Sequence, residues 1–147
     1  MPSLVQASEE FHVNAHQDVC WKFFSNLENI GLCIPGCEAV TRMDDASAIF
    51  KVKLKVGYLS KTFELKAKIK ESVAPSHLVF TGEGSDAEIN GSLDITAGEK
   101  GSSIKYGIEI VPVSVTGKTA IALIGKDLVR KQTSEFASCV KSKLESA

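Results

Sequence analysis

The stretch that decides the fold consists of FKVKLKV (residues 50–56), GYLS (57–60) and FELKAKIK (63–70). In both outer runs apolar and charged residues alternate with a period of two, which is the pattern of a half-buried β-strand. The stretch therefore predicts a long antiparallel hairpin with one dry face and one charged face. The charged face carries Lys51, Lys53, Lys55, Lys66, Lys68 and Lys70.

Downstream of the hairpin the same alternation continues and then stops. It predicts strands at about 77–81, 86–95 and 104–110, separated by glycine-containing turns. From about Thr116 the period changes from two to near 3.6, which predicts an amphipathic C-terminal helix of roughly 25 to 30 residues. The apolar stripe of this helix consists of Ile121, Ile124, Leu128, Phe136, Val140 and Leu144.

Upstream of the hairpin we expect a strand at 4–13 and two short helices. The first helix spans about 16–25, with Asn14 as a suitable capping residue. The second spans about 27–33 and must end before Pro35, because the residue that precedes a proline avoids the helical region. Pro35 and Gly36 then predict a turn.

These elements define an α+β protein, which we expect to be a single domain over residues 1–147. Each of about seven antiparallel strands has one dry face, and one helix cannot cover a flat sheet of that width. A curved sheet wrapped around the long C-terminal helix can be covered. Such curvature leaves space between helix and sheet, where ligands commonly bind.

Composition argues against several classes of protein. The chain has 44% hydrophobic and 24% charged residues, as ordered domains do. Its net charge of −1 lacks the basic excess of a nucleic-acid-binding protein. The sequence has no membrane-spanning run and no signal-peptide pattern at its start, so we expect a cytoplasmic protein. In that reducing compartment we expect no disulfide among Cys20, Cys33, Cys37 and Cys139.

Catalytic and metal-binding patterns are weak. The sequence contains no nucleophile elbow, zinc-protease or phosphate-loop motif. His16 and Cys20 lie one helical turn apart, but a reactive thiol also needs an electropositive site and an orienting partner. The pair Cys33 and Cys37 lacks the second pair of ligands that a zinc site requires. Asp86 alternates with apolar residues and is expected to point to water. We therefore predict a protein that is not an enzyme and carries no metal or cofactor.

Four segments resemble a known family. They are Val19-Cys20-Trp21 leading to Cys33-Ile-Pro-Gly-Cys-Glu38; Lys55-Val-Gly57 before the Phe63 strand; Gly82-Glu-Gly84 before the Gly91 strand; and Tyr106 with Gly117-Lys118, Gly125 and Phe136. The chain is similar to the CoxG family of carbon monoxide dehydrogenase subunits, within the START-like and birch-pollen-allergen superfamily of helix-grip proteins.

This resemblance implies an accessory protein of a molybdenum hydroxylase complex, without a catalytic role. It also implies a hydrophobic small molecule, such as a quinone or lipid, in the cavity between sheet and helix, and peripheral contact with the inner face of the membrane. The expected cavity wall consists of Phe24, Ile34, Val52, Leu54, Phe63, Leu65, Phe80, Ile89, Leu93, Ile108, Ile110, Ile121, Ile124 and Leu128. Tyr58, Tyr106 and Ser114 are expected as polar groups at its mouth.

Two alternatives stay open at this level. The protein can be a docking module with a filled core that binds a protein or an anionic membrane through its lysine face or through the turn at Ile34 and Pro35. The superfamily also contains cyclases and hydrolases, although no convergent titratable groups point to such an enzyme here.

Overall fold

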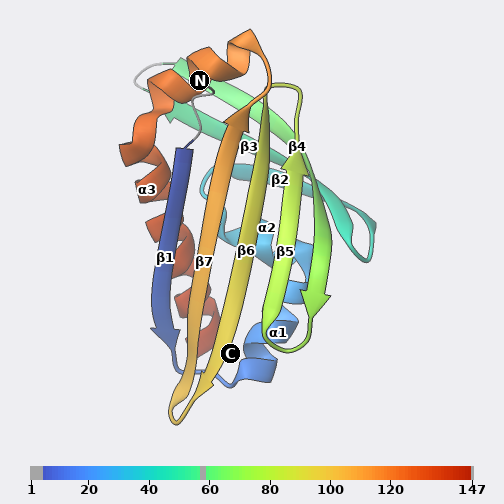
Figure 1. Ribbon diagram of the computed structural model, residues 1–147, viewed down its shortest axis with the longest axis vertical. Coiled ribbons are helices and arrows are strands. Elements are labelled where there is room, and N and C mark those ends of the chain that lie inside the picture. The colour runs from blue at the N-terminus through green and yellow to red at the C-terminus, as the bar shows by residue number, and fades with distance from the viewer. Residues whose placement is uncertain (1–4, 57–58, 147) are drawn as a thin grey trace.

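A single antiparallel sheet dominates the computed structural model, which describes residues 5–56 and 59–146 (Figure 1). The elements in chain order are β1 (Val5–Val13), α1 (Gln17–Ser25), α2 (Leu27–Cys33), β2 (Cys37–Asp44), β3 (Ser47–Val56), β4 (Leu59–Val73), β5 (His77–Glu83), β6 (Ala87–Gly98), β7 (Gly101–Pro112) and α3 (Val115–Glu145). The predicted α+β architecture is confirmed: a seven-stranded sheet, two short helices after the first strand and a long C-terminal helix.

The sheet has the strand order β1-β7-β6-β5-β4-β3-β2. Chain neighbours from β2 to β7 pair as successive hairpins, and β1 closes onto β7. The sheet curls, so that β2 and β3 run obliquely behind the other strands while α3 follows β1 (Figure 1). Helices α1 and α2 cover the end of the sheet opposite to the start of α3.

One strand was not located from the sequence. Strand β2 has an almost fully exposed burial pattern and two irregularities in its pairing with β3. Only Cys37 and Val40 of this edge strand are half-buried, and they are three positions apart, so its sequence carries no period-two signal.

Helix capping also differs from the prediction. The residue that caps α1 is His16, without a side-chain cap, and Asn14 instead donates its backbone N–H to Glu145 Oε2 at 2.9 Å. Side-chain caps occur at the other two helices: Asn26 accepts from the N–H of Glu28, and Ser114 accepts from the N–H of Gly117. The prediction of Asn14 as a cap is wrong: Asn14 forms a hydrogen bond with Glu145 at the end of α3 and does not cap α1.

Helix α3 is kinked at Gly125, where φ is +69°. That backbone conformation interrupts the helix and is open to glycine at little cost. The kink turns the first part of α3 across the end of the sheet, as Figure 1 shows. The kink therefore separates a first segment of α3, which covers the end of the sheet, from a second segment, which packs along β1.

The hydrophobic core falls into three clusters. The largest lies around Phe24, Ile104 and Val140, all at most 1% exposed, and joins α1, the sheet and the last turns of α3. A second cluster joins α2 to β3 and β4, and a third joins β1 to the middle of α3. Close packing is thus complete near the end of α3, and the space between the clusters lies toward its start.

Candidate ligand-binding site

A cavity of about 250 Å³ lies between the inner face of the sheet and α3. Its volume exceeds the roughly 150 Å³ of an engineered cavity that admits benzene. The lining comes from all elements except α1 and β2. It consists of Val5, Leu27, Ile30, Ile34, Pro35, Phe50, Val52, Leu54, Phe63, Leu65, Ala67, Phe80, Thr81, Gly82, Ala87, Ile89, Tyr106, Ile108, Ile110, Gly117, Ala120, Ile121, Leu128, Val129, Gln132, Thr133 and Phe136.

The register of the sheet gathers the apolar side chains of the cavity. Val52 lies opposite Phe63 in the hairpin of β3 and β4, and Ile89 lies opposite Ile110 in the pair of β6 and β7. Because successive side chains of a strand point to opposite faces, each such pair shares one face with its neighbours. The alternation seen in the sequence thus becomes one continuous concave apolar surface.

Most of the expected wall residues lie along this cavity. They are Ile34, Val52, Leu54, Phe63, Leu65, Phe80, Ile89, Ile108, Ile110, Ile121 and Leu128. Two others lie elsewhere: Phe24 and Leu93 pack into the largest core cluster and do not line the cavity. Both are inward-facing, but they occupy the closely packed end of the molecule. Tyr58 and the side chain of Ile124 lie outside the described residues.

Small inward residues do not by themselves mark the cavity. At Gly91 the Phe80 ring fills the space, since a Cβ added there would lie 2.3 Å from a ring carbon. Ala122 is exposed on α3, whereas Ala67 does line the cavity. Free space thus depends on which neighbours reach into it, and residue size alone does not show this.

Tyr106 is a buried wall residue, which corrects its expected place at the mouth. It is 4% exposed, and its hydroxyl donates to the backbone carbonyl of Thr133 on α3. The rings of Phe11 and Phe136 contact it edge-on, with centroids at 6.3 and 5.2 Å. Burial raises the pKa of the phenol well above its usual range. Tyr106 therefore stays neutral and ties α3 to the sheet.

Ser114 also has a structural role rather than a place in the cavity lining. Its Oγ donates to Asp86 Oδ1 at 3.0 Å and accepts from the N–H of Gly117 at 2.9 Å. Asp86 Oδ2 lies 3.1 Å from Nζ of Lys61, whose amine also lies 5.5 Å from the centre of the Phe63 ring. These contacts fasten the start of α3 to the sheet.

Asp86 is therefore not a solvated carboxylate, as the sequence pattern suggested. Its side chain is 20% exposed, and Lys61 and Ser114 hold the pKa of the carboxyl below its usual value. Lys61 lies opposite Leu54 in the hairpin register, on the same face as Phe63. Lys61 and Phe63 are two positions apart in one strand, so the sequence could have identified Lys61 as the cation near the dry face.

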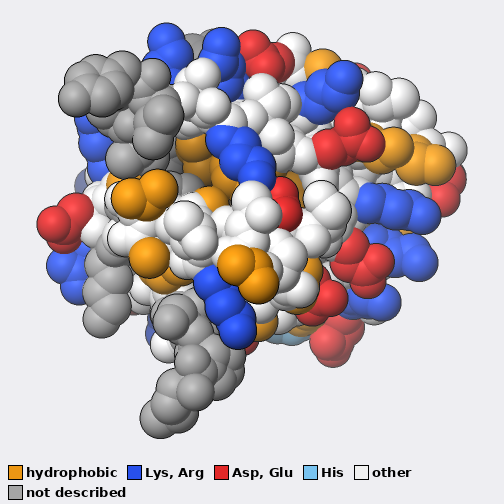
Figure 2. All heavy atoms as spheres, turned by 90° about the horizontal axis from the view of Figure 1, so that it is seen from above, with side chains coloured by type: hydrophobic (Ala, Val, Ile, Leu, Met, Phe, Trp, Pro, Cys, Tyr) orange, Lys and Arg blue, Asp and Glu red, His pale blue; other side chains and the backbone are white. Residues whose placement is uncertain are grey.

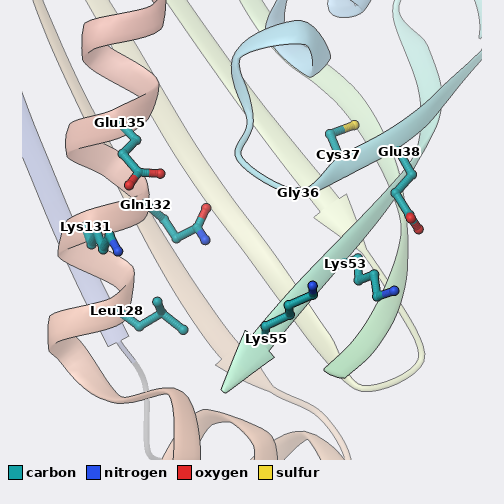
Figure 3. A pocket seen from close by; sticks show the side chains of 9 residues that line it. All are labelled: Gly36, Cys37, Glu38, Lys53, Lys55, Leu128, Lys131, Gln132 and Glu135. Carbon is teal, nitrogen blue, oxygen red and sulfur yellow. The ribbon is translucent and has the colours of Figure 1, made fainter. Parts of the chain in front are cut away.

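A charged groove of about 430 Å³ lies beside the cavity, between α3 and the edge formed by the turn after α2 and by β3 (Figure 3). Leu128 and Gln132 line both spaces, and Figure 3 shows both side chains reaching from α3 toward the gap. The groove is also lined by Gly36, Cys37, Glu38, Lys53, Lys55, Lys131 and Glu135. The apolar cavity and the charged groove therefore adjoin each other.

Gly36 shapes the wall of this groove. Its φ is +84°, and its carbonyl accepts a hydrogen bond of 2.8 Å from the N–H of Lys53. A Cβ at this position would lie 2.2 Å from the carbonyl oxygen of Lys53. Only glycine allows the turn after α2 to approach β3 this closely.

A disulfide joins the end of α2 to α3 next to the groove. Cys33 and Cys139 are bonded, with Cα atoms 5.4 Å apart. The expectation of no disulfide is thus wrong. It rested on the inferred compartment, while a pair separated by 106 positions in the chain leaves no local signal. Cys33 is therefore not available to form a thiolate pair with Cys37.

Cys20 and His16 do not form a reactive pair in the structure. Cys20 is fully buried, its Sγ lies 3.9 Å from the carbonyl oxygen of Ala15, and His16 is exposed. Burial raises the pKa of the Cys20 thiol, which disfavours the reactive thiolate.

A curved sheet that grips a C-terminal helix around an apolar cavity defines the class of START-like helix-grip proteins. Within this class the chain belongs to the CoxG family, because the family model that describes the CoxG subunit of carbon monoxide dehydrogenase matches residues 10–145. The family predicted from the sequence is confirmed. A search of curated protein sequences finds no match.

Solved structures share the fold at low sequence identity. A conserved protein from Geobacillus kaustophilus has a TM-score of 0.74 and 14% identity, covering 95% of this chain and 94% of that one. A START superfamily protein from Mycobacterium smegmatis has a TM-score of 0.71 and 12% identity, with 96% and 97% covered. The Zhui aromatase/cyclase from Streptomyces sp. R1128 has a TM-score of 0.69 and 10% identity, with 97% and 94% covered.

Proposed function

We propose that this protein is a non-enzymatic accessory protein of a molybdenum hydroxylase and holds a hydrophobic small molecule, such as a quinone or lipid, between the sheet and α3. The apolar cavity of about 250 Å³ carries this proposal. Among the described residues no buried side-chain polar atom lacks a hydrogen-bond partner, so the wall offers apolar contact and little polar recognition. Binding would derive from removal of apolar area from water, at about 25 cal/mol per Å².

The family description supports the partner part of the proposal, since it names a component of carbon monoxide dehydrogenase. An accessory role also fits the chemistry of the cavity. The buried phenol of Tyr106 already donates its proton to a backbone carbonyl, and Cys20 lies in another part of the core. Neither group is placed to transfer a proton to a molecule in the cavity.

Native mass spectrometry of the purified protein, followed by organic extraction, tests ligand binding. We expect a co-purifying hydrophobic molecule, or a thermal shift with a panel of quinones and fatty acids. Leu128→Asp puts a charge on the cavity wall and should abolish binding. Leu123→Asp is the matched control, because Leu123 is 57% exposed on the same helix and should keep the ligand.

A second variant distinguishes the loss of the ligand-binding space from a defect in folding. Ala120→Phe adds an aromatic ring to the cavity wall on α3 and should exclude the ligand while adding no charge. If Ala120→Phe folds with an unchanged circular dichroism spectrum and still binds the same ligand, the cavity is not the binding site. A protein that is empty and gives no thermal shift with the panel would refute the carrier function.

The second candidate function is docking on a protein or membrane. Five lysines of the outer sheet face are exposed, as predicted: Lys51, Lys55, Lys66, Lys68 and Lys70. The start of α3 also exposes Val115 (81%) and Leu123 (57%), with Val113 (47%) just before it. Figure 2 looks onto this end of the molecule, where hydrophobic side chains lie between basic ones.

These exposed lysines and apolar side chains support the proposed peripheral contact with a membrane surface. Within the described part of the chain, no helix combines the length and the hydropathy needed to cross a bilayer. Disulfides are uncommon in the cytosol, so the bond between Cys33 and Cys139 argues against that compartment. Co-sedimentation with anionic and neutral vesicles separates docking from ligand carriage when it uses charge-reversal variants of Lys51, Lys66, Lys68 and Lys70, which do not line the charged groove.

A further inference from the structure

The charged groove adjoins the apolar cavity on the side of α3. Leu128 and Gln132 of α3 belong to the lining of both spaces. A molecule that extends out of the cavity at these two side chains would enter the groove. The leucine offers apolar contact to a chain, and the glutamine amide can donate hydrogen bonds to a polar group.

The groove carries a net positive charge. Lys53, Lys55 and Lys131 line it together with Glu38 and Glu135. Within the described residues none of these three lysines forms an ion pair with a carboxylate. Figure 3 shows Lys55 on β3, across the gap from α3. The lysine ammonium groups are thus available to a partner of opposite charge.

Two contacts hold the elements on either side of the groove in place. The hydrogen bond from the N–H of Lys53 to the carbonyl of Gly36 fixes the turn against β3, and the disulfide from Cys33 to Cys139 fixes α2 against α3. The turn on one side of the groove is therefore tied to β3, and α3 on the other side is tied to α2, so the backbone positions that carry the lysines are held beside the cavity.

We infer that the groove is the head-group site of a single-chain amphiphile whose head is anionic, a carboxylate or a phosphate, and whose apolar chain lies in the cavity. This inference rests on the proposed function as a carrier of hydrophobic molecules. A charge-assisted hydrogen bond from lysine is stronger than one between neutral groups. An anionic head should consequently bind better than a neutral head on the same chain.

Displacement of the neutral fluorophore N-phenyl-1-naphthylamine from the intact protein tests the inference. The competitors are decanoic acid, decyl phosphate and decan-1-ol, which share one chain length and differ in the head. We expect the two anions to displace the fluorophore at about tenfold lower concentration than the alcohol. The ratio between the two anions shows whether the head is a carboxylate or a phosphate.

Two double variants with the same change in net charge locate the effect. Lys55→Gln with Lys131→Gln should remove the preference for the anions and leave decan-1-ol binding unchanged. Lys66→Gln with Lys68→Gln changes exposed residues that do not line the groove and should keep the preference. Unchanged binding of the alcohol also shows that a variant is folded.

The outcomes separate this inference from the function on which it rests. Equal binding of acid, phosphate and alcohol would overturn the head-group site and leave the carrier function standing. The same would follow if both double variants lost the preference equally, because net charge alone would then explain it. Failure of the fluorophore and all three competitors to bind would overturn both.

Discussion

Loss of the disulfide between Cys33 and Cys139 should destabilise this protein strongly. The bond closes a loop with a sequence separation of 106 residues. In the chain-entropy description, a loop of that length lowers the stability of the unfolded state by about 4.8 kcal/mol. Measured effects of native disulfides commonly reach about 2–5 kcal/mol, so the expected loss lies at the upper end of that range.

Urea unfolding with and without reductant measures this loss. With a urea dependence of about 2 kcal/mol per M, the midpoint should fall by roughly 2 M when the disulfide is reduced. Cys139→Ser should show the lower midpoint in both conditions, and reductant should not change it further. The unfolded, unreduced wild-type protein should contain two reactive thiols, from Cys20 and Cys37.

Cys37→Ser is the matched control, since Cys37 is a free cysteine that lines the groove next to the disulfide. This variant should respond to reductant as the wild type does. Four reactive thiols in the unreduced wild-type protein would contradict the assigned bond. Equal midpoints for reduced and oxidised protein, with the bond demonstrated by peptide mapping, would refute the entropic argument.

Three further changes test other contacts. Gly91→Ala places a Cβ 2.3 Å from the Phe80 ring and should cost about 1–3 kcal/mol of stability by overpacking, measured by urea unfolding. Tyr106→Phe removes the hydroxyl donor to a carbonyl of α3 and should lower stability by about 1 kcal/mol, measured by thermal unfolding. Asp86→Asn should destabilise the protein at neutral pH. Since Lys61 lowers the pKa of the Asp86 carboxyl in the folded state, that stabilisation is present above the usual value of 3.8. The difference between wild type and variant should therefore shrink as the pH falls below 3.8 through the folded-state pKa.

Each of these variants has an outcome that contradicts its reasoning. Gly98→Ala is the control for the glycine change, because its nearest contact would be 3.5 Å, and an equal loss in both would exclude the ring contact as the cause. A Tyr106→Phe protein as stable as wild type would show that the hydroxyl contributes no net stability. For Asp86→Asn, a pH-independent difference would show that the carboxylate charge is not the stabilising feature.

The elements with a regular dry face were predicted with bounds close to those observed. The hairpin around FKVKLKV and FELKAKIK forms β3 and β4, and the helix expected at 27–33 is α2 (Leu27–Cys33). Here the period of the hydrophobic pattern matches the geometry of the element, so local sequence is sufficient. Edge strand β2 has half-buried residues that are three positions apart instead of two, and it was missed for that reason.

Most of the apolar residues predicted for the site line one cavity, whereas the charged groove beside it was not predicted. The alternation along the strands predicted that residues such as Phe63 and Ile108 face the cavity. It could not show that Phe24 lies in the filled end of the core. Lys55 and Lys131 were separate features of a strand and a helix in the sequence. Their common groove depends on how α3 lies relative to β3.

The sequence by itself determined the family, the order of the elements and which side of each strand is dry, because these depend on residue type and on periods of two and 3.6. The tertiary structure alone decided where the core stays unfilled, that Cys33 meets Cys139, and that a charged groove adjoins an apolar cavity. These features arise between segments far apart in the chain. Their geometry follows from the curl of the sheet and the kink at Gly125, which set distances that no local pattern records.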